Sequence, residues 1–219
     1  MNQPVVAVID YDIGNSKSML NALVALGLSP ILTRDPGGIA AADALILPGV
    51  GAFCQGMGNL EKYSLLDAIH RFIAQDKPFL GVCLGMQLLL EESEEFGVTV
   101  GMGVIKGKVK KLAVDPTAGE KLPHIGWNAV CEPDAARWTD SIFATIPDSS
   151  DVYFVHSFAA IPVDESDILS ITRYGSSIFC SSLHKGNIWG CQFHPEKSGP
   201  IGLAILRKFV TLTGYEEGI

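Results

Sequence analysis

The chain has 219 residues, 47% of them hydrophobic, and a formal net charge of −8. This length and composition suit a single domain spanning residues 1–219, and the negative charge argues against nucleic acid as a partner. No apolar run approaches the roughly 18 residues that a membrane-spanning helix needs, and the first residues lack the basic start of a signal peptide, so we expect no membrane association and a cytoplasmic location.

Two features of the composition indicate no special function. The lysines at residues 106–111 alternate with apolar residues or glycine, as the solvent face of a strand does. Five cysteines are an odd number, without the dense spacing of a disulfide framework. We expect four of them to be reduced packing residues: Cys54, Cys131, Cys180 and Cys191.

The first half of the chain alternates strand-like and helix-like segments. Short apolar runs predict strands at residues 5–9, 30–33, 44–47 and 78–82. Helical spacing predicts helices at residues 16–26, 60–75 and 84–92, and Gly27 is a plausible stop for the first. This alternation is typical of an α/β fold with an open, largely parallel twisted sheet flanked by helices.

The second half has a different pattern, with closely spaced strands followed by one amphipathic helix at residues 201–212. The turns at residues 174–177 and 184–187 indicate antiparallel hairpins. Residues 115–120 and 148–151 are predicted surface loops. The predicted strands are residues 104–112, 128–131, 152–158, 168–174, 177–183 and 187–192.

A glycine-bearing loop, Leu-Pro-Gly-Val-Gly-Ala-Phe at residues 47–53, follows the third predicted strand. In an open α/β sheet, sites form beyond the carboxyl ends of the strands. The N–H of Val50 or Gly51, with that of Leu84, would make an oxyanion hole. A phosphate loop is the competing interpretation, but no Gly-Lys-Ser/Thr follows the glycines.

The fourth predicted strand leads into Gly-Val-Cys-Leu-Gly-Met-Gln at residues 81–87, which places Cys83 at a strand-to-helix turn. A residue on so sharp a turn has a strained backbone, and glycines two positions before and after it remove side chains that would collide there. The N-terminus of the following helix favours a thiolate and an adjacent oxyanion. Cys83 is therefore a candidate nucleophile; the alternative is a small buried hydrophobic residue.

A histidine and a carboxylate follow the last predicted strand, in Gln-Phe-His-Pro-Glu-Lys-Ser at residues 192–198. A free thiol with the reference pKa of about 8.5 is little ionised at neutral pH, so a nucleophilic cysteine needs a base within reach. His194 can take the proton, and Glu196 can accept the other ring N–H. Alone, His-Pro-Glu is typical of a polar loop. No Cys-x-x-Cys or His-Glu-x-x-His spacing occurs, so we expect no metal and no cofactor.

The strand-to-helix turn at Cys83 (the elbow) and the His-Pro-Glu motif together resemble the class I glutamine amidotransferases, whose triad is Cys-His-Glu and whose fold is flavodoxin-like. Further stretches are similar to the glutaminase subunits of imidazole glycerol phosphate synthases in particular, so the resemblance covers nearly the whole chain. These stretches are Asp-Tyr-Asp-Ile-Gly-Asn at residues 10–15, the loop at residues 47–53, Pro-His-Ile-Gly-Trp-Asn at residues 123–128, Tyr-Phe-Val-His-Ser-Phe at residues 153–158, and Lys197. Asp12 departs from this pattern, because many members have glycine there.

The resemblance implies roles for the matching residues. Gly49, Gln87, Ser157 and Phe158 would bind the substrate, L-glutamine; for Gln87, which lies one helical turn after Cys83, the alternative is an ordinary packing amide. For Trp127, Tyr153 and His156, the alternative to a partner or gate role is core packing. For Lys197 the alternative is a free surface lysine. The residues that would face a partner subunit or the ammonia exit are Asp12, Asn15, Trp127, Tyr153, His156 and Lys197.

The expected reaction is hydrolysis of glutamine to glutamate and ammonia, with Cys83 as nucleophile and His194 as proton carrier. Free ammonia is protonated at neutral pH, so it must pass directly to an acceptor site, and none is visible in this sequence. The resemblance implies a heterodimer with a (β/α)-barrel cyclase subunit that makes imidazole glycerol phosphate and aminoimidazole carboxamide ribonucleotide in histidine biosynthesis. Two alternatives are a glutaminase of another pathway, such as anthranilate or aminodeoxychorismate synthesis, and an inactive subunit that only binds its partner.

Overall fold

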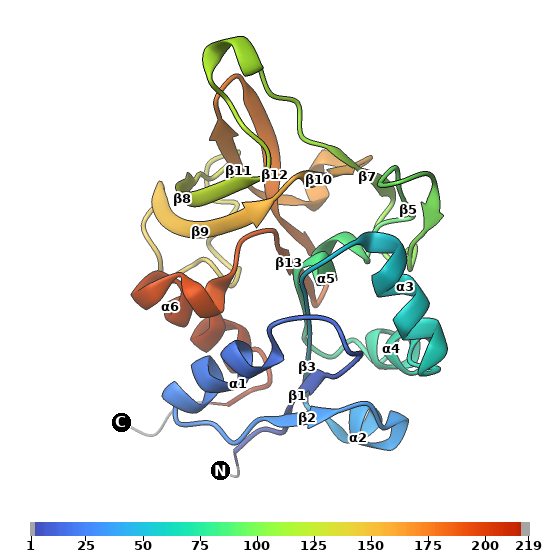
Figure 1. Cartoon of the computed structure of the whole chain (residues 1–219). Helices are drawn as coiled ribbons and strands as arrows, with labels where there is room; N and C mark the ends of the chain where they lie inside the picture. The colour runs from blue at the N-terminus through green and yellow to red at the C-terminus, as the bar shows by residue number, and fades with distance from the viewer. Residues whose placement is uncertain (1–2, 216–219) are drawn as a thin grey trace.

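The computed structural model describes residues 3–215, and its centre is an 11-stranded mixed sheet (Figure 1). Its first part is parallel, in the order β2-β1-β3-β4-β13, and the remaining order is β12-β10-β7-β5-β6, with β11 paired to β12. The predicted α/β class with a largely parallel core and antiparallel hairpins is confirmed. The parallel strands are β1 (Val6–Ile9), β2 (Ile31–Thr33), β3 (Ala44–Gly49), β4 (Phe79–Cys83) and β13 (Ile188–Cys191).

Helices cover both faces of the parallel part. Alternate residues of β1 point to opposite faces, as the pleat requires: Val6 and Val8 join one buried cluster, and Ala7 and Ile9 join the other. The first cluster includes α1 (Ser16–Ala25) and α6 (Gly199–Thr211). The second includes α2 (Pro36–Ala41), α3 (Phe53–Lys62), α4 (Leu66–Ile73) and α5 (Leu84–Gln87).

The strands of the second half other than β13 form the mostly antiparallel part of the large sheet, in which β5 and β7 are a parallel pair, and a separate two-stranded sheet, β8 with β9. Both predicted hairpins are confirmed, since β11 pairs with β12 and β12 with β13, all antiparallel. Within the described residues, three short 3₁₀ helices lie at Pro116–Ala118, Glu165–Asp167 and Pro195–Lys197. The strands are β5 (Glu92–Ser93), β6 (Thr99–Val100), β7 (Gly107–Lys111), β8 (His124–Val130), β9 (Ser150–His156), β10 (Phe158–Pro162), β11 (Ile168–Tyr174) and β12 (Ser177–Lys185).

The helix predicted at residues 60–75 is wrong as a single element, because α3 ends at Lys62 and α4 begins at Leu66. Ser64 has a positive φ of 53°. The N–H of Leu65 donates to the carbonyl of Leu60, and the N–H of Ser64 to that of Glu61, which is the Schellman pattern that ends a helix. Leu60 and Leu65 are both buried, so the stop is also fixed by packing.

The helix predicted at residues 84–92 is too long. α5 ends at Gln87, Leu88–Leu90 form a tight buried turn, and the N–H of Glu91 donates to the carbonyl of Gly107. Glu92 and Ser93 then pair with β7, so sheet hydrogen bonds replace the helix predicted from local spacing.

Other boundaries also differ from the prediction. Residues 152–158 are not one strand, because the chain leaves the two-stranded sheet after His156 and enters the large sheet at Phe158. The strand expected at residues 128–131 begins earlier, at His124, and the strand expected at residues 104–112 is confined to β7. Lys108 and Lys110 of β7 pair with Glu94 at 3.2 Å, and their side chains are partly exposed, on the face predicted to meet solvent.

Candidate active site

Cys83 lies at the junction of β4 and α5 with φ 53° and ψ −107°, a backbone conformation that costs energy for a residue with a side chain. A Cβ on Gly81 would lie 2.6 Å from the carbonyl oxygen of Gly85, and a Cβ on Gly85 would overlap the carbonyl oxygen of Leu47. The predicted elbow is therefore present, and the flanking glycines are required by close backbone approach.

His194 and Glu196 form a buried pair immediately after β13. Nδ1 of His194 lies 2.9 Å from Oε1 of Glu196, and both side chains are only 2% exposed. A carboxylate accepts the Nδ1 proton, which leaves Nε2 to exchange a proton with another group. Nε2 is buried and has no hydrogen-bond partner within residues 3–215.

Cys83 and His194 are coupled electrostatically. Burial by itself opposes protonation of His194, but hydrogen bonding and charge from the neighbouring Cys83 and Glu196 outweigh it and raise the pKa of His194 to about 10. A protonated imidazole beside Cys83 is therefore the arrangement that this site favours at neutral pH.

A pocket of about 330 Å³ opens at Cys83. Most of the residues expected around the substrate line it, including the oxyanion candidates, but Gly49 does not. Gly49 is packed beneath the pocket wall, where a Cβ would overlap the Tyr11 hydroxyl and lie 3.0 Å from Cβ of Leu84. The lining residues are Val50, Gly51, Cys83, Leu84, Gln87, Glu95, Pro123, Val155, His156, Ser157 and Phe158.

The loop that carries the oxyanion candidates is held at both ends. The hydroxyl of Tyr11 donates to the carbonyl of Pro48 at 2.7 Å, and burial keeps Tyr11 a neutral donor because it raises the pKa of this phenol far above its usual range. At the other end, the N–H of Phe53 donates to Oε2 of Glu95 at 2.7 Å. Between them, Gly51 has a φ of 126°, and a Cβ there would meet only Oε1 of Gln55, at 4.0 Å.

Glu95 and Tyr11 were missed by sequence reasoning. Glu95 lies in the pocket wall although its segment gives no motif, and it follows the short strand β5, of which only Glu92 belonged to the helix predicted at residues 84–92. Tyr11 lies in a stretch that carried the family resemblance, but nothing in its neighbours indicates that it reaches Pro48.

The residues expected at a partner surface are divided between exposed and buried positions. Trp127 is 58% exposed and lies opposite Tyr153 in the β8–β9 register, with ring centroids 6.1 Å apart. His156 is buried and lines the pocket. Its Nδ1–H donates to the carbonyl of Phe158 at 2.8 Å, so its Nε2 accepts from Nδ1 of His124 at 3.1 Å.

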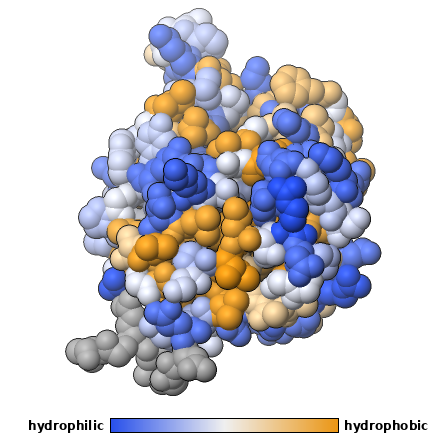
Figure 2. All heavy atoms as spheres, turned by 60° about the horizontal axis from the view of Figure 1, so that its bottom comes forward, coloured by the Kyte–Doolittle hydropathy of each residue, from blue (hydrophilic) through white to orange (hydrophobic). Residues whose placement is uncertain are grey.

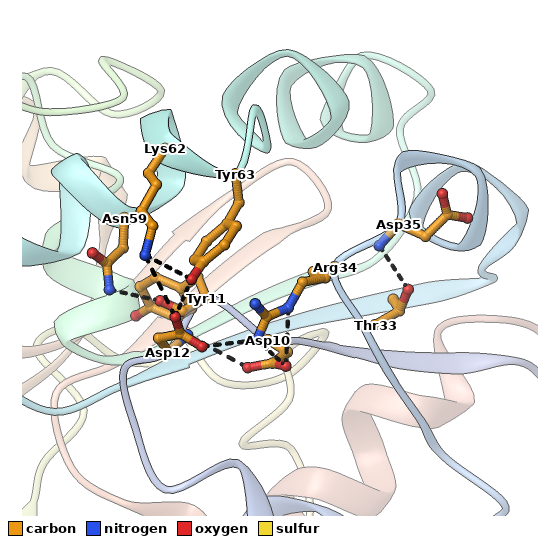
Figure 3. Close-up of polar contacts among 9 residues, drawn as sticks. All are labelled: Asp10, Tyr11, Asp12, Thr33, Arg34, Asp35, Asn59, Lys62 and Tyr63. Atoms are coloured by element: carbon orange, nitrogen blue, oxygen red, sulfur yellow. Dashed lines mark hydrogen bonds and ion pairs between the residues drawn. The ribbon is translucent and has the colours of Figure 1, made fainter.

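Asp12 has a φ of 59°, the left-handed conformation for which glycine is favoured and Asp is tolerated. Its carboxylate accepts hydrogen bonds from the Tyr63 hydroxyl and from Arg34 (Figure 3), and these two contacts lower the pKa of Asp12. The side chain therefore compensates locally for a conformation that glycine would adopt freely.

The two remaining residues expected at the partner surface differ in burial. Lys197 is exposed, and Asn15 is half-buried, with its Oδ1 accepting a hydrogen bond from the Ser18 hydroxyl.

A second, larger pocket of about 820 Å³ lies between the end of α1 and α6, and none of the predicted site residues lines it. Near it, Val24 of α1 and Ile31 and Leu32 of β2 are exposed, and Figure 2 shows hydrophobic side chains gathered on this face.

Within residues 3–215, no cluster of three or more His, Cys, Asp or Glu side chains could hold a metal ion, and no helix is long and apolar enough to cross a membrane. All five cysteines are free, but Cys54 is exposed and is not the packing residue we expected.

Comparison with known families agrees with this geometry. Residues 7–212 match the family model Glutamine amidotransferase class-I. The imidazole glycerol phosphate synthase subunit HisH of Thermosynechococcus vestitus is 43% identical over 213 residues, which are 97% of this chain and 99% of that protein. The chloroplastic imidazole glycerol phosphate synthase hisHF of Arabidopsis thaliana is 46% identical over 94% of this chain, but the match spans only 34% of that longer protein.

Solved structures show the same fold at low sequence identity. A crystal structure of a glutamine amidotransferase superposes with a TM-score of 0.73 at 19% identity, covering 96% of this chain and 100% of the other. The PurLQS structure from Thermotoga maritima gives a TM-score of 0.70 at 18% identity, covering 96% and 99%. With a family match over nearly the whole chain and full-length relatives above 40% identity, this chain belongs to the class I glutamine amidotransferases, among the HisH subunits of imidazole glycerol phosphate synthase.

Proposed function

We propose that this chain hydrolyses the side-chain amide of glutamine, producing glutamate and ammonia, with Cys83, His194 and Glu196 as the catalytic triad. The observation that carries the proposal is the placement of Cys83. It lies on a strained elbow, opens on a pocket of about 330 Å³, and is electrostatically coupled to a buried histidine whose other nitrogen is held by a carboxylate.

The first half of the reaction forms a thioester. The Cys83 thiolate attacks the carboxamide carbon, and His194, protonated in the resting state, gives its Nε2 proton to the departing nitrogen as the carbon–nitrogen bond breaks. Ammonia leaves and the glutamyl group remains on sulfur. The neutral imidazole then takes a proton from water, whose oxygen displaces sulfur and releases glutamate. Glu196 keeps the ring oriented and stabilises its charged form in both halves.

The pocket provides groups for the substrate and for the oxyanion. The backbone N–H groups of Leu84 and of Val50 or Gly51 are the proposed oxyanion donors, since all three residues line the pocket beside Cys83. Gln87, Ser157 and Phe158 would contact the substrate directly. Gly49 would act by allowing the close packing of Tyr11 and Leu84 that shapes the loop.

Glu95 fits the charged end of glutamine. Its carboxylate is in the pocket wall, and one of its oxygens already accepts the Phe53 N–H. An α-ammonium group placed beside the other oxygen would complete a charge-assisted hydrogen bond. Binding of substrate and anchoring of the oxyanion loop would then involve the same side chain.

We further propose that the ammonia passes to a (β/α)-barrel cyclase subunit that makes imidazole glycerol phosphate and aminoimidazole carboxamide ribonucleotide in histidine biosynthesis, in the cytoplasm. The names of the full-length relatives support this assignment, because they are subunits of imidazole glycerol phosphate synthase. In this proposal the exposed Trp127 is an aromatic anchor, and the buried His156 acts as a gate rather than as a surface contact. Asp12, Asn15, Tyr153 and Lys197 complete the proposed partner surface.

The test separates ammonia production from ammonia use. In the complex with the cyclase, Cys83→Ala should abolish glutamine-dependent product formation and leave product formation from added ammonium salts intact. Cys54→Ser is the matched control, because Cys54 is a free but exposed cysteine outside the pocket. Glutamine-dependent turnover by Cys83→Ala would refute the nucleophile assignment, and loss of ammonium-dependent turnover would refute a role confined to ammonia supply.

A further inference from the structure

Gln192 is a fully buried amide immediately after β13. Its backbone N–H donates to the carbonyl of Ser181 at 2.9 Å, which fixes the main chain next to β12. Its side chain does not line the substrate pocket. Instead, Nε2 of Gln192 lies 3.6 Å from Sγ of Cys83, and Oε1 lies 2.9 Å from Nε2 of Gln87.

The orientation of this amide is dictated by a backbone carbonyl. Nε2 of Gln87 donates to the carbonyl of Phe158 at 3.0 Å, and a carbonyl can only accept. The second proton of the Gln87 amide is directed at Gln192, so the Gln192 atom facing it must be oxygen. The remaining Gln192 group, the NH₂ donor, is therefore the one that faces the Cys83 sulfur.

We propose that Gln192 donates a hydrogen bond to the Cys83 thiolate and so stabilises the charged nucleophile, and that Gln87 and the Phe158 carbonyl fix this donor in place. The inference rests on the proposed role of Cys83 as nucleophile. Hydrogen bonds to a charged acceptor are stronger than neutral ones, and a buried donor cannot be replaced by solvent. The elbow backbone thus positions the sulfur, and Gln192 favours its ionised form.

This role predicts a separation between binding and chemistry. Gln192 is outside the pocket, so its loss should lower kcat and leave KM for glutamine nearly unchanged. Gln87 lines the pocket and also holds Gln192, so loss of its amide should affect both constants. A purely structural role for Gln192 would lower the amount of folded protein without changing the ionisation behaviour of Cys83.

The experiment measures thiolate formation directly, without requiring glutamine turnover. In the full-length Cys54→Ser chain, which lacks the exposed cysteine, the rate of Cys83 alkylation by iodoacetamide is followed from pH 5 to pH 10 by peptide mass spectrometry. Gln192→Met, of similar volume, should react about tenfold more slowly at pH 7, with its profile displaced to higher pH. Ser182→Ala is the control: Ser182 is buried on β12 and hydrogen-bonded to Ser170, away from the pocket.

A profile of Gln192→Met that superimposes on the parent profile would overturn the proposal, whether or not glutaminase activity falls. If Gln192→Met does not fold, the proposal is tested in the chain that keeps Gln192, by following the resonances of its side-chain amide. With glutamine side chains labelled with ¹⁵N, the Gln192 NH₂ resonances should move as Cys83 ionises and should not move in Cys83→Ala. Constant Gln192 resonances across the Cys83 titration would exclude the contact. Alkylation rates and the Gln192 resonance shifts report on the ionisation of Cys83 and do not require turnover. They therefore stay informative even if the substrate proves not to be glutamine.

Discussion

The backbone carbonyl of Tyr153 accepts the N–H of His194 at 2.9 Å, so the strand that carries a proposed partner contact also holds the proposed general base. The N–H of Tyr153 donates to Oγ of Ser198 at 3.0 Å, and the Ser198 hydroxyl donates to the carbonyl of His194 at 2.6 Å. Both backbone groups of one β9 residue are thereby joined to residues 194–198. A displacement of β9 by a partner would be transmitted to His194 through the direct backbone hydrogen bond and through the Ser198 hydroxyl.

Ser198→Ala should weaken this connection. The substitution leaves the Tyr153 N–H without its acceptor in a partly buried setting, which costs about 1–3 kcal/mol and should lower Tm by several degrees. Glutaminase kcat should fall as well, because the His194 segment loses its support. Ser141→Ala is the matched control, since Ser141 is a buried serine that also donates to and accepts from backbone groups, but those of Trp138 and Phe143 instead of Tyr153 and His194. Equal kcat values for the two variants would contradict the coupling.

His194→Asn and Glu196→Gln should differ in severity. Removing His194 removes the proton carrier and should reduce glutaminase kcat by about 10²–10⁴-fold. Glu196→Gln retains an oxygen that can accept the Nδ1 proton but loses the charge that raises the pKa of His194, so its loss should be smaller. Steady-state rates of both variants in the complex give the ranking. The reverse order would mean that the two roles are misassigned.

The buried pair His124 and His156 should make the fold sensitive to acid. Burial lowers the pKa of each to about 4, against 6.5 in the unfolded chain. Their contribution to stability is therefore complete above pH 6.5 and is lost as the pH falls toward 4. For His156 alone the loss at pH 5 is about 2 kcal/mol, or roughly 4–8 °C in Tm.

Thermal unfolding of wild type and His156→Gln between pH 7.5 and 4.5 measures the stability lost on protonation of this pair. The substitution should make the fall of Tm with decreasing pH less steep. His70→Gln is the control, because His70 is an exposed residue of α4. Parallel curves for wild type and His156→Gln would show that protonation of this pair does not limit acid stability.

The isolated subunit should be a poor glutaminase that its partner activates. Gly49 is locked beneath Tyr11 and Leu84, whereas the space around Gly51 is open, so the peptide between Val50 and Gly51 can rotate while the rest of the loop stays fixed. A difference of about 1–3 kcal/mol between two loop states corresponds to about 5–150-fold activation.

Glutaminase rates of the subunit alone, with the cyclase, and with the cyclase plus its nucleotide ligand test this expectation. Gly51→Ala strains a residue at φ 126° and should reduce the activation, whereas Gly58→Ala, on the exposed side of α3 with no atom within 4 Å of the added Cβ, should not. Equal rates under all three conditions would indicate a fixed oxyanion hole.

The sequence by itself determined the features that depend on neighbouring residues. Gly81 is required by the turn itself, because a Cβ there would lie 2.6 Å from the carbonyl oxygen of Gly85, whereas Gly85 is required by the neighbouring strand β3, where its Cβ would overlap the carbonyl oxygen of Leu47. His194 and Glu196 are separated by one proline, so their pairing follows from local geometry. Strands β1, β3 and β4 were predicted for a similar reason, because each is an apolar run that both faces of the sheet bury.

Only the tertiary structure decided which distant residues meet around Cys83. Gln87 and Gln192 are 105 residues apart and touch because β13 pairs with β4, a register that no local pattern specifies. Glu95 lines the pocket just after β5, whose pairing with β7 is a contact between segments that no local pattern specified. The physical reason is the same in both cases: hydrophobic burial and sheet hydrogen bonds act between segments far apart in the chain, and they outweigh the weaker local preferences from which sequence reasoning begins.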